Sequence, residues 1–182
     1  MTRLYWLLWA LATATTGLLG GLFLGHALLL GRFLDWLLIS GRASTLAATY
    51  PLFREGPGRT GLEVFYAVAA LQVLAGVAFG LVSLSNGRAR WLGVLVGLGA
   101  IAWPIVHYAS GFAAVESRVL RSATEAPPDA AIAFVAWNGT VHLIHVTTLF
   151  IALIALLAVP LVSARPQPSG ARPRGALPAE PR

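Results

Sequence analysis

The sequence contains no cysteine, and only 11% of its 182 residues are charged. The absence of cysteine excludes disulfide bonds, thiolate zinc sites, iron–sulfur clusters and cysteine-based catalysis. A soluble domain of this length usually carries about 25% charged residues, whereas this chain is 57% hydrophobic with a mean hydropathy of +0.75. The scarcity of charge therefore places the chain among membrane proteins.

Lysine is also absent, so the net charge of +6 comes from thirteen arginines. The arginines flank uncharged runs and form no separate basic amphipathic stretch, which indicates membrane topology and not nucleic-acid binding. With four spans, seven arginines share the side of both termini and six lie on the other side. The arginines of the long first connection stand among acidic residues, which weakens their effect on topology, so we predict that both termini are cytoplasmic.

Four long uncharged runs predict an all-α, polytopic membrane protein folded as a four-transmembrane-helix bundle. Each run exceeds the roughly 20 residues needed to cross about 30 Å of hydrocarbon, and a helix satisfies its own backbone hydrogen bonds in lipid. The predicted spans cover about residues 4–30, 63–86, 91–115 and 131–162. The transmembrane domain is predicted over 1–163, with an extramembrane loop over 32–62 and a disordered Pro/Arg-rich tail over 164–182.

Local signals refine this outline. Residues 32–38 form an amphipathic segment, which is predicted to lie in the membrane interface. Pro104 interrupts the third span and predicts a kink, and Pro127-Pro128-Asp129 marks the start of the fourth helix.

Glycines recur at four-residue spacing in three of the spans. This spacing places them on one helix face, where small residues allow close helix approach in lipid. The glycines are Gly17, Gly21 and Gly25, Gly76 and Gly80, and Gly93 and Gly97. We favour intramolecular packing of the bundle, and the alternative is contact with a second copy or with a partner in a membrane complex.

All four histidines lie in or near the uncharged runs, where ionisable residues are costly and often functional. At a helical rise of about 1.5 Å per residue, they fall roughly 26–35 Å from the terminus side, in the loop-rich leaflet. Asn138, His142 and His145 are spaced i, i+4 and i+7, so they share one helix face. His26, His107 and Glu63 reach a similar depth from the other three spans.

This group of side chains has the chemistry of a ligand or cofactor site. Imidazole binds iron, copper or zinc, so His107, His142 and His145 are candidate metal ligands, with Glu63 as an additional donor. A haem b would need one or two axial histidines facing each other across the bundle core. The structural alternative is that the histidines form hydrogen bonds that hold the helices together.

The layout resembles the anthrone-oxygenase-like family of small four-span membrane proteins. The resemblance covers roughly residues 10–162 and rests on size, a short second turn and the element Phe134-Val135-Ala136-Trp137-Asn138 at the start of the last helix. Where the family carries Pro-Leu-Asn after its third span, this chain has Glu116-Ser117-Arg118-Val119-Leu120. The resemblance implies a related fold, oxygenase activity on a phenolic polycycle, and Trp137 and Asn138 as site residues.

Three hypotheses for function follow. The first is a redox or oxygenase-type site for a haem, a metal or a hydrophobic quinone-like or phenolic ligand. The second is a non-catalytic accessory or assembly subunit of a larger membrane complex. The third is a small transporter, which ranks last because the sequence shows no inverted repeat and no pair of broken helices.

Overall fold

The structure is a computed structural model and describes residues 3–85, 87, 89–121 and 125–164. This part of the chain contains helices and no strand. The elements are α1 (Arg3–Gly25), the π-helical segment η1 (His26–Leu30), α2 (Gly31–Ile39), α3 (Ala43–Glu55), α4 (Arg59–Ser83), α5 (Arg90–Ala109), α6 (Phe112–Leu120) and α7 (Pro128–Ser163). Four helices are long and apolar enough to cross a membrane, namely Arg3–Ile39, α4, α5 and α7. The predicted all-α, multi-pass membrane fold is confirmed, and its outer surface contacts the lipid bilayer.

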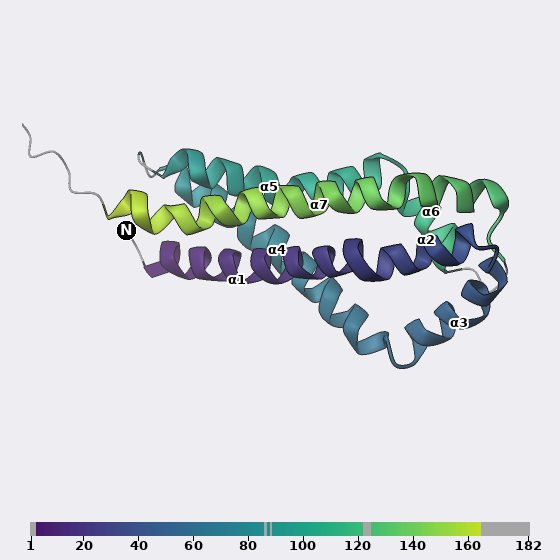
Figure 1. The fold of residues 1–182 in the computed structure, drawn as a ribbon. Helices are drawn as coiled ribbons and strands as arrows, with labels where there is room; N and C mark the ends of the chain where they lie inside the picture. Colours follow the sequence, from purple (N-terminus) through teal and green to yellow (C-terminus); the bar gives the residue numbers. More distant parts are fainter. Residues whose placement is uncertain (1–2, 86, 88, 122–124, 165–182) are drawn as a thin grey trace, which may run out of the picture.

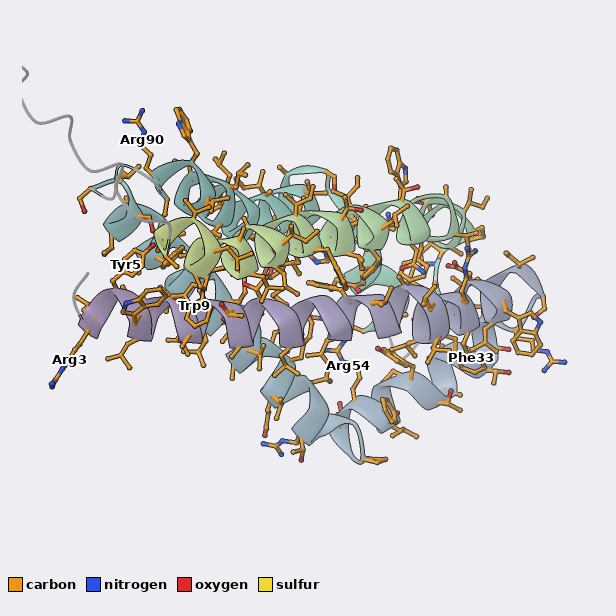
Figure 2. All side chains as sticks on the ribbon, turned by 60° about the vertical axis from the view of Figure 1, so that its left-hand side comes forward. Arg3, Tyr5, Trp9, Phe33, Arg54 and Arg90 are labelled. Atoms are coloured by element: carbon orange, nitrogen blue, oxygen red, sulfur yellow. The ribbon has the colours of Figure 1, made fainter. Side chains whose placement is uncertain are left out.

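The four long helices form a bundle in which each packs against two neighbours. α4 contacts α1 and α5, and α7 contacts the same two helices from the other side. The start of α1, the end of α7 and the α4–α5 turn lie at one end, whereas α2, α3 and α6 gather at the other (Figure 1). Arg3 and Arg90 extend away from the bundle at the terminal end (Figure 2).

The first span differs from its predicted limits. Residues 32–38 do not lie apart as an interfacial segment, because α1, η1 and α2 follow one another without a break as far as Ile39. Leu34, Asp35 and Leu37 are buried there, and α2 packs against α7. The predicted loop therefore begins only at Ser40, and most of it is the helix α3.

The third span ends earlier than predicted, whereas the fourth begins where the sequence indicates. α5 continues through Pro104 and ends at Ala109, short of the predicted residue 115. Gly111 has a φ of +80°, in the left-handed region that favours glycine, so the chain turns there before α6 begins. α7 begins at Pro128 with Asp129 in its first turn, as predicted. The predicted tail lies outside the described residues from 165 onward.

Glycines let α4 and α5 approach closely. A Cβ added to Gly76 would lie 2.6 Å from the Ala100 Cβ, and one added to Gly80 would lie 3.0 Å from the Gly93 carbonyl oxygen. The predicted intramolecular packing role is thereby confirmed for these two helices. On α1 the same spacing does not bring a neighbouring helix close. An added Cβ at Gly21 or Gly25 would lie more than 4 Å from every atom in the part of the chain that the structure describes.

Candidate functional site

The structure brings the four histidine rings together from three segments of the chain. His26 comes from η1, His107 from α5, and His142 and His145 from α7. The His26 and His142 rings are stacked with centroids 4.0 Å apart. His145 lies 5.5 Å from His142 and 5.6 Å from His107, measured between ring centroids. We call these four residues the histidine row.

Helical periodicity explains why α7 contributes three polar side chains to this region. Asn138, His142 and His145 share the inward face and are all buried. His26 reaches them from the π-helical turn η1, which holds an extra residue per turn and so changes the face presented by the helix on either side.

Aromatic side chains surround the histidine row. The Phe23 ring lies 4.7 Å from His145 and the Trp103 ring 5.9 Å from it. On the opposite side, Phe112 lies 5.7 Å from His107 and 5.8 Å from His142. These rings make the surroundings of the imidazoles largely apolar, so polar contacts between them are stronger than they would be in water.

Two carboxyl groups lie near the row, and one of them contacts it directly. Asn138 Nδ2 donates to Asp35 Oδ1 at 2.9 Å and to the Gly31 carbonyl at 3.2 Å. The Asn138 backbone carbonyl lies 2.8 Å from His142 Nδ1. Glu116 Oε2 lies 3.5 Å from His107 Nε2. Glu116 of α6 therefore contacts the row at His107, whereas Asp35 of α2 is linked to it through Asn138.

The sequence patterns did not indicate either carboxyl as a site residue. Asp35 belongs to the segment predicted to be interfacial, although it is the only acidic residue among the first 54, which could have marked it. Glu116 follows the turn at Gly111, which the hydrophobic run conceals. Gln72 was also missed. It is fully buried and accepts a hydrogen bond of 2.9 Å from Trp103 Nε1, which fixes the indole beside His145.

The structure does not bring Glu63 or Trp137 to the histidine row. Glu63 is exposed and forms an ion pair of 2.9 Å with Arg59 one helical turn earlier. Trp137 is 56% exposed, because it precedes the inward-facing Asn138 by one residue and so points about 100° away from it. The helical rise gives Glu63 a depth similar to that of the histidines, but depth does not determine which side of its helix a residue faces.

The residues present do not fit a metal ion or a haem in this arrangement. Within the described residues, no three His, Asp or Glu side chains are placed to hold a metal ion. The stacked His26 and His142 rings, with planes 20° apart, face each other through their π surfaces and not through their nitrogens. The rings of His107 and His145 have centroids 5.6 Å apart with planes inclined at 51°, and Phe23, Trp103 and Phe112 pack against them.

Several polar atoms of the site are buried without a hydrogen-bond partner among the described protein atoms. They are His107 Nδ1 and both ring nitrogens of His145. A neutral imidazole offers one donor and one acceptor. Leaving such a group unpaired in an apolar interior costs about 1–3 kcal/mol. The site thus holds a concentration of unused hydrogen-bonding capacity inside the membrane.

Gly31 is required for the close contact between α2 and α7. An added Cβ would lie 3.1 Å from Asn138 Nδ2 and 3.0 Å from the His26 carbonyl oxygen. We expect Gly31→Ala to lower the free energy of unfolding by about 1–3 kcal/mol through overpacking. Thermal unfolding in detergent measures this, with Gly25→Ala as the matched control because its Cβ meets nothing within 4 Å. Equal melting temperatures for the two variants would contradict the expectation.

The geometry of this site is the guide to function. Comparisons of the chain with known protein families, with curated proteins and with solved structures found no match.

Proposed function

We propose that the histidine row binds the oxygen-bearing head of a hydrophobic quinone-like or phenolic ligand and exchanges a proton with it, as in a redox or oxygenase-type site. The unpaired ring nitrogens carry this proposal. A hydroxyl or carbonyl group entering the row would satisfy donors and acceptors that the protein leaves free. Pairing these nitrogens lowers the free energy substantially, because an unpaired polar group is costly in an apolar interior.

The surroundings of the row suit an aromatic ligand. Phe23, Trp103 and Phe112 present ring faces and edges to the histidines, and aromatic pairs of this kind contribute about 0.5–1.5 kcal/mol beyond their buried area. The polar head of such a ligand would lie among the histidines and its aromatic body among the aromatic rings. Most ligand pockets have this composition, being apolar with a few placed polar groups.

The outer face of α5 carries an open, almost flat apolar surface formed by Ile101, Pro104, Ile105, Tyr108 and Ala109. Tyr108 is exposed and packs edge-on against His107, with ring centroids 5.1 Å apart. A ligand dissolved in the bilayer would thus meet an apolar surface directly beside the least buried part of the histidine row.

Proton transfer is the chemistry that the row can supply. A neutral imidazole nitrogen takes the phenolic proton, so that the ligand O–H bond breaks and an N–H bond forms. The products of this step are a phenolate and an imidazolium. The resemblance to anthrone-oxygenase-like proteins supports the same substrate class, and of its two site residues Asn138 lies beside the row, with its backbone carbonyl 2.8 Å from His142 Nδ1.

Binding of a short-chain ubiquinone and of a hydroxylated anthrone to the protein in lipid nanodiscs tests the proposal. We expect His145→Phe to weaken binding on the order of tenfold or more, which corresponds to about 1.4 kcal/mol, the scale of one or two hydrogen bonds. Thr147→Ala is the matched control, since Thr147 lies on the exposed face of the same helix. Unchanged affinity in His145→Phe, or the same loss in both variants, would refute a ligand site at the row.

An exposed glycine face on α1 favours a second candidate, an accessory subunit of a membrane complex. Gly21 and Gly25 leave space that nothing in the described chain fills within 4 Å. Small residues at such spacing allow helices to approach closely in lipid. Cross-linking in membranes tests this candidate, because Gly21→Leu should then abolish a cross-linked species that His145→Phe retains.

A further inference from the structure

We propose that Glu116 is the group through which the histidine row exchanges protons with the aqueous phase at the α3–α6 end of the bundle. Its Oε2 atom lies 3.5 Å from His107 Nε2. The Glu116 side chain is 28% exposed and that of His107 17%, whereas His145 is completely buried. Exposure thus decreases along the series Glu116, His107, His145, as a path from water into the core requires.

The turn at Gly111 creates this contact. The left-handed conformation of Gly111 ends α5 and redirects the chain into α6. Without this turn, Glu116 would lie further along the same helix as His107. With it, Glu116 lies on α6 and its carboxyl group contacts His107 on α5. The same turn places Phe112 against His107, so the imidazole is held between an aromatic ring and a carboxyl group.

Charged and titratable groups from α3, α5 and the end of α6 face Glu116. The charges of Arg54 on α3 and Arg121 at the end of α6 attract the Glu116 carboxylate. Glu116 also interacts electrostatically with Tyr50 of α3. Arg54 extends from α3 toward the bundle (Figure 2). On α5 the facing group is His107, whose ring centroid lies 5.6 Å from that of His145 on α7.

These neighbours leave Glu116 suited to gain and lose a proton. Burial raises the pKa of the Glu116 carboxyl, while Arg121 and Arg54 act in the opposite direction and leave it raised overall. A raised carboxyl pKa lies closer to neutral pH than that of an exposed glutamate. Groups that transfer protons work best when their pKa is near the working pH.

The transfer is a single balanced step. The Glu116 O–H bond breaks and a bond forms between the proton and His107 Nε2, which leaves a carboxylate and an imidazolium. Water at the loop end then returns a proton to the carboxylate. The imidazolium can release its other proton from Nδ1, which is buried without a protein partner, toward His145. That second transfer requires rotation of a ring or a bridging water.

Asp35 does not share this role. Its Oδ1 accepts a hydrogen bond from Asn138 Nδ2, so Asp35 holds the amide of Asn138 in place. The Glu116 carboxyl instead lies against His107 Nε2 and is partly exposed.

Exchange of the histidine ring N–H protons with water tests the proposal and needs no ligand, so it can fail independently of the proposed function. The measurement uses the full chain with ¹⁵N-labelled histidine in nanodiscs and solvent-exchange NMR. We expect Glu116→Gln, which keeps the size of the side chain, to slow exchange at His107 and His145 on the order of 10²-fold, the usual contribution of a placed acid–base group. Glu116→Asp should restore much of the rate.

Two controls separate proton exchange from structure. Glu63→Gln removes an exposed carboxyl that is paired with Arg59, and it should leave the histidine exchange rates unchanged. His107→Phe should slow exchange at His145 although Glu116 is intact, because the path passes through His107. Unchanged exchange in Glu116→Gln would overturn the proposal. The proposal would also be overturned if the slower exchange in Glu116→Gln accompanied a loss of thermal stability and Glu116→Asp did not restore the rate.

Discussion

Replacement of Asn138 by leucine is expected to lower the free energy of unfolding by about 2–5 kcal/mol, among the largest effects of any single substitution in this protein. The Asn138 amide satisfies both the Asp35 carboxyl and the Gly31 carbonyl inside the bundle. Leucine has a similar volume but no donor, so both oxygens would be left buried without their partner. Chemical denaturation in mixed detergent micelles measures the change.

A double substitution distinguishes this explanation from simple misfit of the leucine side chain. If the loss comes from the unpaired carboxyl, Asp35→Leu in the Asn138→Leu background should recover part of it, with a coupling of about 0.5–3 kcal/mol. Trp137→Leu is the matched control on the next residue, which is exposed and should change stability by less than about 0.5 kcal/mol. Additive effects of the two core substitutions would show that Asn138 and Asp35 do not depend on each other.

The sequence was sufficient for the fold and for the grouping of the histidines in one part of it. Uncharged runs have one stable structure in lipid, and helical rise then assigns each residue a depth. Depth alone placed His26, His107, His142 and His145 at one level, and the structure has their rings in contact or near contact. On α7 the helical period also gave the shared face of Asn138, His142 and His145.

The orientation of a residue around its helix was the part that depth could not supply. Glu63 has a suitable depth and nevertheless faces outward, paired with Arg59. Asp35 and Glu116 reach the site through two irregular features, the π-helical turn before α2 and the left-handed Gly111 before α6. Neither feature interrupts the hydrophobic pattern, so the sequence showed a longer third span and an interfacial segment where the structure has a bend and a continuous helix.

The seam between α4 and α5 should be the least tolerant part of the bundle, and a paired glycine substitution shows why. A Cβ added to Gly93 would fall on the Ser83 Cβ and lie 2.7 Å from its Oγ, so there is no space for any side chain. We expect Gly93→Leu to separate the two helices and to cost about 3 kcal/mol or more, at the upper end of overpacking effects. Its expression as folded protein and its melting temperature in detergent are the measurements.

Gly21→Leu makes the same chemical change on a helix face where no atom of the described residues lies within 4 Å of an added Cβ. It should therefore not lower the melting temperature of the isolated protein, and the higher helix propensity of leucine, by about 0.8 kcal/mol or slightly less, should raise it slightly. A strong loss of stability in Gly21→Leu would mean that the α1 face is covered within the fold. Undiminished stability combined with loss of a cross-linked species in membranes would instead assign that face to association, and the two glycine patterns would then serve different purposes: one closes the bundle, and the other receives a neighbour.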